Sequence, residues 1–134
     1  MSDPTIVLDS GVIEQVNANP EFRWLLRDLI ENGWVPVIPT VVLAEAITGR
    51  AHDAPVNQAV KRLGTVGTTE PTARRAGRLR FAVQRSGARR VPSGIAAIVA
   101  AHASDCERSV VFTTDPTELR RLLADSPRII IDRP

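Results

Sequence analysis

Short apolar runs alternate along the chain with longer segments in which apolar residues recur at helical spacing. The runs that predict buried strands are residues 5–8, 34–38, 109–113 and 128–131. A weaker strand is predicted at residues 65–68. Pro36 lacks the amide proton that a central strand needs, so we expect the second strand at an edge of the sheet.

Helices are predicted between these strands. In the first of them Phe22, Leu26 and Leu29 fall on one face, and Asn32 with Gly33 ends the pattern. The predicted helices cover residues 20–32, 41–48, 54–63, 70–85, 95–103 and 116–124. Strands that alternate with helices predict a mainly parallel sheet covered on both faces, so we expect a single α/β domain over residues 1–134.

The composition argues against a secreted, disulfide-stabilised or membrane-spanning protein. The chain has 134 residues, of which 43% are hydrophobic and 24% charged, as in an ordinary globular domain. The single cysteine, Cys106, cannot form an internal disulfide, and no basic-then-apolar leader precedes the first strand. The longest apolar run, residues 95–101, is far shorter than the roughly 20 residues of a membrane span. We therefore expect a cytoplasmic protein without a membrane segment.

Charge is distributed unevenly. The net charge is +2, but residues 1–70 carry 5 basic and 9 acidic side chains, whereas residues 71–134 carry 12 and 6. No acid interrupts the arginines that lie between Glu70 and Asp105: Arg74, Arg75, Arg78, Arg80, Arg85, Arg89 and Arg90. This segment is either an RNA-backbone contact or a solvated helix whose arginine stems cover apolar surface. Trp24 and Trp34 lie in apolar patterns and are expected in the core.

Two aspartates directly follow predicted strands. Asp9 ends the first strand, and Asp115 comes two residues after Thr113, which ends the late strand. Since functional crevices of parallel sheets lie beyond the carboxyl ends of the strands, the two carboxylates converge if these strands are neighbours. The alternative is that each aspartate caps a helix. Asp115 with Glu118 has the spacing of a capping box.

Glu45 lies in the apolar helical segment 41–48, where a glutamate has few polar neighbours. It is either a metal ligand or an exposed or ion-paired side chain. Three carboxylates without a cluster of histidines or cysteines form an oxygen-only site that suits Mg²⁺ or Mn²⁺. Such ions activate water for cleavage of a phosphodiester.

Four motifs in the order VLDSG (7–11), PTVVLAE (39–45), IVAAHA (98–103) and FTTDPTEL (112–119) resemble the PIN-domain family, and in particular VapC-type toxins. The match covers nearly the whole chain. The resemblance implies a three-layer α/β/α sandwich and a Mg²⁺-dependent endoribonuclease that cuts structured RNA, tRNA or rRNA. It also implies a homodimer that is neutralised by a VapB-type antitoxin.

The resemblance assigns the site to residues that match the family motifs: Asp9, Glu45, Thr113, Asp115 and Glu118. Asp9 and Asp115 would bind the metal, with a third carboxylate at position 96. Alanine occupies that position here, and no acid lies between Pro92 and Ala103. Because hard-metal affinity depends on the number of converging carboxylates, Ala96 predicts a weakened metal site and an impaired nuclease. The sequence leaves open whether Ala96 is engineered or natural.

The RNA-contacting residues that we predict are Arg74, Arg75, Arg78, Arg85, Arg89 and Arg90. There are two alternative functions. The first is a noncatalytic RNA- or protein-binding module that keeps the PIN scaffold. The second is a receiver-like phosphoacceptor, which needs a lysine on a late strand, whereas Lys61, the only lysine, lies in a helical pattern.

Overall fold

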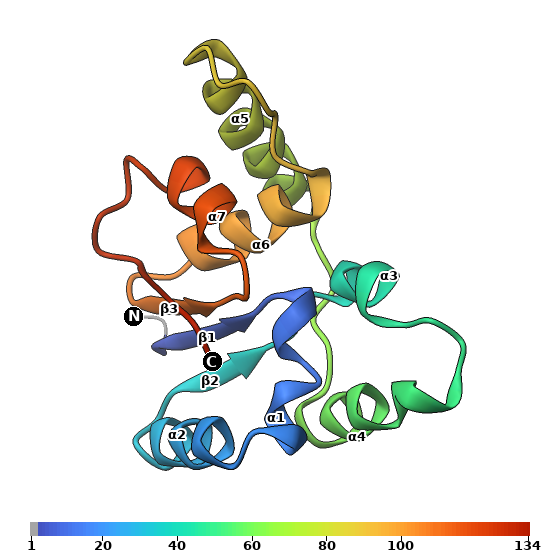
Figure 1. Cartoon of the computed structure of the whole chain (residues 1–134). Coiled ribbons are helices and arrows are strands. Elements are labelled where there is room, and N and C mark those ends of the chain that lie inside the picture. The colour runs from blue at the N-terminus through green and yellow to red at the C-terminus, as the bar shows by residue number, and fades with distance from the viewer. Residues whose placement is uncertain (1–2) are drawn as a thin grey trace.

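The computed structural model describes residues 3–134 and contains a four-stranded, all-parallel sheet (Figure 1). Its strands are β1 (Thr5–Leu8), β2 (Val35–Val37), β3 (Ser109–Phe112) and β4 (Ile130–Asp132), in the spatial order β2-β1-β3-β4. Leu8, the last residue of β1, is paired with Phe112, the last residue of β3. The carboxyl ends of the two central strands are therefore level with each other.

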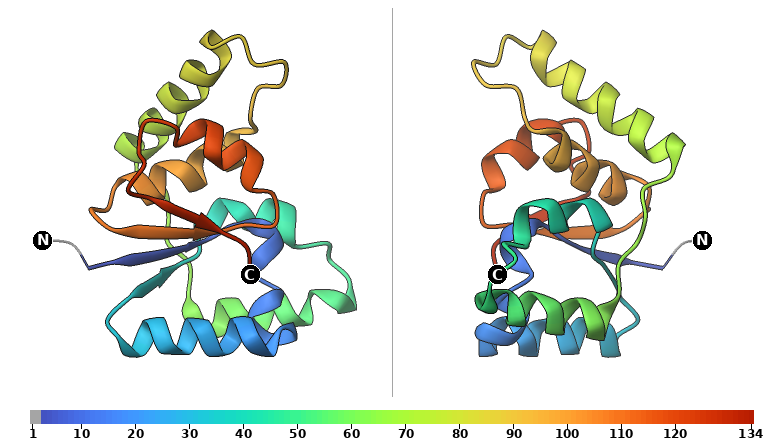
Figure 2. Two further views of the ribbon diagram at one scale, coloured as in Figure 1. Left: turned by 60° about the vertical axis from the view of Figure 1, so that its left-hand side comes forward. Right: turned by 90° about the vertical axis from the view of Figure 1, so that its right-hand side faces the viewer.

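Helices cover both faces of the sheet (Figures 1 and 2). One face carries α1 (Gln15–Ala18), α2 (Pro20–Glu31) and α4 (Ala54–Leu63). The other carries α6 (Gly94–Ser104) and α7 (Pro116–Leu122), with α5 (Glu70–Arg85) outside them. The short α3 (Leu43–Ala46) follows β2 at the carboxyl side of the sheet. This arrangement confirms the predicted α/β/α sandwich.

The core lies on both faces of β1 and β3, against α6 on one face and against α1, α2 and α4 on the other. All four residues of β1 and of β3 are buried, as expected for central strands covered on both faces. Seven of the eleven residues of α6 are buried, and most of them are alanines. Small side chains allow this helix to lie close to the two central strands, which brings its first turn near their carboxyl ends.

Several predicted boundaries shift. β2 pairs only with β1, so the edge position expected from Pro36 is confirmed. The strand predicted at residues 65–68 is wrong: this mostly exposed segment makes one isolated bridge, between Val66 and Pro39. The helix predicted at residues 41–48 begins as a 3₁₀ turn and ends at Ala46. The last predicted helix stops at Leu122, two residues early.

The tryptophan prediction is wrong for Trp24, which is 64% exposed. On α2, Phe22 and Leu26 are buried and lie on the face opposite Trp24, where its ring contacts the guanidinium of Arg27 at 5.3 Å from the ring centroid. Apolar character alone therefore did not reveal which side of the helix faces the core. Trp34 is half-buried.

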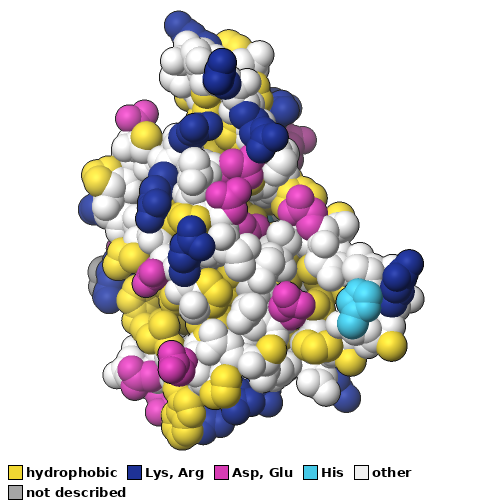
Figure 3. All heavy atoms as spheres, in the orientation of Figure 1, with side chains coloured by type: hydrophobic (Ala, Val, Ile, Leu, Met, Phe, Trp, Pro, Cys, Tyr) yellow, Lys and Arg dark blue, Asp and Glu magenta, His cyan; other side chains and the backbone are white. Residues whose placement is uncertain are grey.

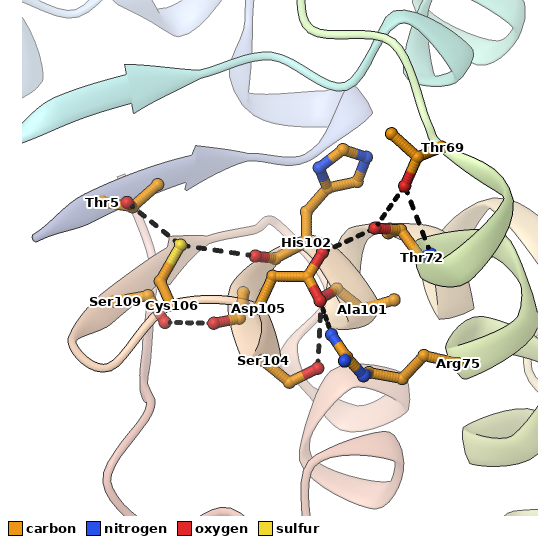
Figure 4. Close-up of polar contacts among 11 residues, drawn as sticks. Thr5, Thr69, Thr72, Arg75, Ala101, His102, Ser104, Asp105, Cys106 and Ser109 are labelled. Carbon is orange, nitrogen blue, oxygen red and sulfur yellow. Dashed lines mark hydrogen bonds and ion pairs between the residues drawn. The ribbon is translucent and has the colours of Figure 1, made fainter. Parts of the chain in front are cut away.

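The helix α5 and the loop after it, residues 70–92, project from the sandwich as an arm (Figure 2). Polar contacts hold its base to the end of α6 (Figure 4). The Thr72 hydroxyl donates to Asp105 Oδ2 at 2.6 Å, and Arg75 forms an ion pair with the same carboxylate. Further along the arm, Arg80 Nε donates to the Pro92 carbonyl at 2.8 Å. Within residues 3–134, no helix has the length and apolarity needed to cross a membrane.

Candidate functional site

The loops after β1 and β3 meet at the carboxyl edge of the sheet. The Asp9 amide donates to the Phe112 carbonyl at 3.1 Å, which extends the ladder between the two strands by one residue. The fully buried Thr113 donates its hydroxyl to Asp9 Oδ2 at 2.8 Å. The same hydroxyl accepts from the Asp115 amide at 3.1 Å. One buried hydroxyl thus joins the loops that carry both predicted aspartates.

Both aspartates also cap helices. The Ser10 amide donates to Asp9 Oδ1 at 2.8 Å, so Asp9 caps the 3₁₀ turn Ser10–Val12. The Thr117 amide donates to Asp115 Oδ1 at 3.3 Å at the start of α7. Each aspartate therefore has the capping role that the sequence offered as the alternative to metal binding, while the fold still places both at the same edge.

Glu45 reaches the same edge from α3. Its side chain is exposed, and Glu45 Oε1 accepts a hydrogen bond from the Ser10 hydroxyl at 3.1 Å. No ion pair joins Glu45 to an arginine in the described part of the chain. Ser10 directly follows Asp9 in the sequence, so this contact places Glu45 close to Asp9. The two carboxylates are bonded by different atoms of Ser10, its hydroxyl and its amide.

Glu118 contacts the start of α6 and does not complete the predicted capping box. The Ser93 amide donates to Glu118 Oε1 at 3.2 Å, and Ser93 Oγ in turn accepts from the Ala96 amide at 3.0 Å. Tertiary packing of α6 on α7 therefore takes Glu118 away from the cap of its own helix. Ala96 lies in the first turn of α6 and is 7% exposed.

The donor set does not fit a divalent cation. Among residues 3–134, no group of three or more acidic, histidine or cysteine side chains is positioned to hold one. All four carboxylates at this edge accept hydrogen bonds from the protein. Thr113 bonds the carboxylate of Asp9 but only the backbone amide of Asp115, so it does not bring the two carboxylates onto one partner. This disagreement with the expected metal site coincides with the alanine at position 96.

A cavity of about 300 Å³ opens beside Glu45 and Ser10. Glu14 and His52 also line it, and sequence analysis missed both because they lie on separate elements and belong to no motif. The buried Asp53 carboxylate lies in the wall of this cavity and accepts hydrogen bonds from the loop 48–50.

The Asp53 carboxylate organises the loop by accepting several hydrogen bonds. The Thr48 hydroxyl donates to Oδ1 at 2.7 Å, and the Gly49 amide donates to Oδ2 at 2.6 Å. The Thr48 hydroxyl is the largest cause that lowers the pKa of Asp53; burial opposes it, and the backbone amides lower it further. Asp53 is therefore held ionised as a structural anion.

The arginines of the arm divide into anchored and outward-facing groups. Arg75 pairs with Asp105, and Arg80 bonds the Pro92 carbonyl, so both help to fix the arm. Arg74 lies on the surface with an ion pair to Glu70. The remaining arginines of the arm are exposed: Arg78, Arg85, Arg89 and Arg90. Figure 3 shows basic side chains gathered over the projecting arm, where the sequence has arginines and no lysine.

Comparison with known proteins gives matches in structure but not in sequence. No protein-family model and no curated protein matches the chain. The structure of VapBC2 from Rickettsia felis bound to a promoter DNA fragment matches with a TM-score of 0.71 and 16% identity, covering 96% of this chain and 98% of that chain. DNA-bound VapBC from Salmonella typhimurium matches with a TM-score of 0.66 and 22% identity over 96% and 97%.

A third structure, VapBC-1 from nontypeable Haemophilus influenzae, matches with a TM-score of 0.70 and 17% identity, covering 95% and 96% of the two chains. The chain has the PIN-like fold. The resemblance drawn from the four sequence motifs is thereby confirmed at the level of the fold. The receiver-like alternative lacks the late-strand lysine that it needs, because Lys61, the one lysine of the sequence, lies on α4.

Proposed function

We propose that this chain is the VapC-type member of a toxin–antitoxin pair, built for endoribonuclease chemistry but lacking one carboxylate of its site. The observation that carries the proposal is the hydrogen bond between Thr113 and Asp9, which unites the loops of the two central strands. Asp115 joins the same network, and Ala96 lies on the helix packed over those strands. The full family site would need an acid at that alanine.

The cofactor of the complete site would be Mg²⁺ or Mn²⁺, which polarises a phosphodiester and activates water. Asp9, Asp115 and a carboxylate at position 96 would hold it, with Glu45 and Glu118 assisting. This chain does not offer a matching donor set within its described residues, so no catalytic step is assigned to the metal here. What remains is a scaffold in which Thr113 keeps Asp9 oriented.

RNA is the proposed substrate class, a structured tRNA or rRNA. The arm supplies exposed arginines that neutralise backbone phosphates, with an affinity that falls as salt rises. Arg75 contributes less than its neighbours because Asp105 already pairs with it. The chain is proposed to act as a homodimer in the cytoplasm, where its free Cys106 stays reduced.

The proposed partner is a VapB-type antitoxin, and a groove between α2 and α4 suits part of it. The groove has a volume of about 430 Å³. Its floor and rim are formed by Val16, Leu26, Ile30 and Leu63 together with Arg23, Arg27, Glu31 and Arg62. An apolar floor edged by three arginines complements an amphipathic helix with acidic residues along its border.

A second candidate function is a noncatalytic RNA- or protein-binding module on the same scaffold. It is favoured by one observation, the absence of a three-ligand metal group among residues 3–134. The two functions predict different activities for a variant in which the carboxylate is restored. A scaffold that lost its chemistry long ago would remain inactive, whereas a site that lacks only one ligand would recover.

Ala96→Asp is the variant that tests the proposal. Position 96 is 7% exposed and lies in the first turn of α6, where the helix dipole favours an acid and offsets part of the cost of burying it. In Mg²⁺ we expect cleavage of tRNA and rRNA to rise by orders of magnitude over the native chain, and chelation should abolish it. Ala96→Asn is the matched control without a charge and should gain little. A folded Ala96→Asp protein without cleavage would contradict the proposal.

A further inference from the structure

The outward face of α5 carries three arginines and one aromatic ring in a line. Spacings of four, three and four positions place them on one side of the helix. We call this set the stripe: Arg74, Arg78, Phe81 and Arg85. The residues by which α5 packs on the sandwich, Thr72, Ala76 and Val83, lie on the opposite side. The stripe therefore points away from the body of the molecule.

Phe81 is 56% exposed although it is one of only three phenylalanines in the chain. The Arg85 guanidinium carbon lies 5.9 Å from the centroid of its ring. Phe22 and Phe112, by contrast, are buried and contact each other in the core. A ring on the outward side of a projecting helix adds nothing to that core. Its exposed face is available to a flat partner.

We propose that the stripe binds a single-stranded segment of RNA, with an unpaired base stacked on Phe81 and the flanking phosphates on Arg78 and Arg85. This inference rests on the proposed RNA-directed function and adds which part of the RNA the arm holds. Aromatic rings between cationic side chains bind single strands because every base has a face for stacking and every linkage a phosphate. The guanidinium of arginine also contacts phosphate in a bidentate manner.

Charge argues against a second copy of this chain on the stripe. No acidic residue lies between Glu70 and Asp105, so a symmetric contact through this face would set arginines against arginines. A duplex is also a poorer fit, since its bases are stacked on each other and cannot cover Phe81. An acidic protein segment would form ion pairs with the arginines of the stripe, but its carboxylates would not stack on the Phe81 ring.

The test measures RNA binding by the native chain through fluorescence anisotropy. The probes are a labelled single-stranded RNA of about 12 nucleotides and a duplex of the same length. Phe81→Leu keeps an apolar side chain but removes the ring, and we expect it to weaken single-strand binding about tenfold while changing duplex binding little. Phe81→Trp should retain the affinity. Since Phe81 is exposed, these changes should leave the fold intact.

Trp24→Leu is the matched control. Trp24 is also exposed and also lies under an arginine, Arg27, but it is on α2, on the other side of the sheet. It should not change RNA binding. The inference is overturned if Phe81→Leu binds like the native chain, if Trp24→Leu loses as much, or if the duplex or polyglutamate competes as well as the single strand.

Binding is measured without cleavage, so the outcome is separate from that of the proposed function. Cleavage by Ala96→Asp together with unchanged binding by Phe81→Leu would overturn the inference and leave the proposed function standing. If Phe81→Leu loses single-strand binding and Ala96→Asp shows no cleavage, the result would support RNA binding by the stripe and contradict the proposed nuclease function.

Discussion

The Thr113 hydroxyl donates a 2.8 Å hydrogen bond to Asp9 Oδ2 across 104 positions of the chain. Thr113 has no exposed surface, and its oxygen also accepts from the Asp115 amide. Because β1 and β3 are parallel neighbours that end level with each other, this contact and the bond from the Asp9 amide to the Phe112 carbonyl join the two loops that form the candidate site.

Thr113→Val should destabilise the protein. The substitution keeps the shape of the side chain but removes the hydroxyl, which leaves the Asp115 amide without its acceptor. A loss of about 1–3 kcal/mol in the free energy of unfolding is expected from a buried group left unpaired. Urea denaturation measures it. Thr117→Val, at an exposed position, is the control, and equal stability of the two variants would contradict the role given to Thr113.

Gly11→Ala should strain the same edge of the sheet. A Cβ atom at Gly11 would lie 2.5 Å from Thr114 Oγ1, closer than side chains approach each other. We expect a loss of about 1–3 kcal/mol in stability from this overpacking. Combining it with Thr114→Ala removes the clashing hydroxyl and should recover much of the loss. Additive effects of the two substitutions in thermal unfolding would show that the loops do not touch in this way.

The stability of the protein should fall as the pH is lowered through the range where histidine titrates. Burial lowers the pKa of His102, whose Nε2 lies 3.0 Å from Thr68 Oγ1. The unfolded chain then binds the proton more readily than the folded one. The contribution of neutral His102 is therefore complete above about pH 6.5 and is lost below it.

His102→Gln should flatten this pH dependence. Urea denaturation at about pH 7.5 and 5.5 compares the native chain, His102→Gln and the control His52→Gln, which alters an exposed histidine. Asp53 does not interfere, because its lowered pKa places its titration below 3.8. An unchanged slope in His102→Gln, or an equal flattening in His52→Gln, would contradict this assignment.

The groove between α2 and α4 should contribute to antitoxin binding. Ile30→Glu places a charge in the apolar part of the groove, and we expect at least about a tenfold loss of affinity for the proposed VapB-type antitoxin. Calorimetric titration measures it. Ile130→Glu changes an isoleucine on β4 that is 57% exposed and lies outside the groove. If Ile130→Glu weakens binding as much as Ile30→Glu, the antitoxin binds elsewhere.

Sequence patterns predicted the central part of the fold because it depends on local composition. The apolar run of β1 and the aspartate directly after it identified a buried strand with a polar residue at its carboxyl end. The order of the motifs then placed Thr113 and Asp115 at the end of β3. Strand neighbours are not encoded locally, so the convergence of these residues needed the structure.

Features that depend on contacts distant in sequence could not be predicted. Glu118 has the spacing of a capping box but bonds the Ser93 amide, since α6 and α7 pack together. Arg75 was grouped with the RNA-contacting arginines, yet Asp105 at the end of α6 pairs with it. The side chain bonds a residue that is distant in sequence in both cases: Ser93 lies 25 positions from Glu118, and Asp105 lies 30 positions from Arg75. A local pattern cannot indicate such a partner.

We propose that one missing carboxylate separates this chain from an active nuclease. The most direct measurement compares the rates of Mg²⁺-dependent RNA cleavage by Ala96→Asp and by the double variant Asp9→Asn/Ala96→Asp. If the acids act together at the edge of β1, Ala96→Asp should cleave orders of magnitude faster than the native chain, and the double variant should return to the native rate. Equal rates for the two variants, or no cleavage by a folded Ala96→Asp protein, would contradict the claim.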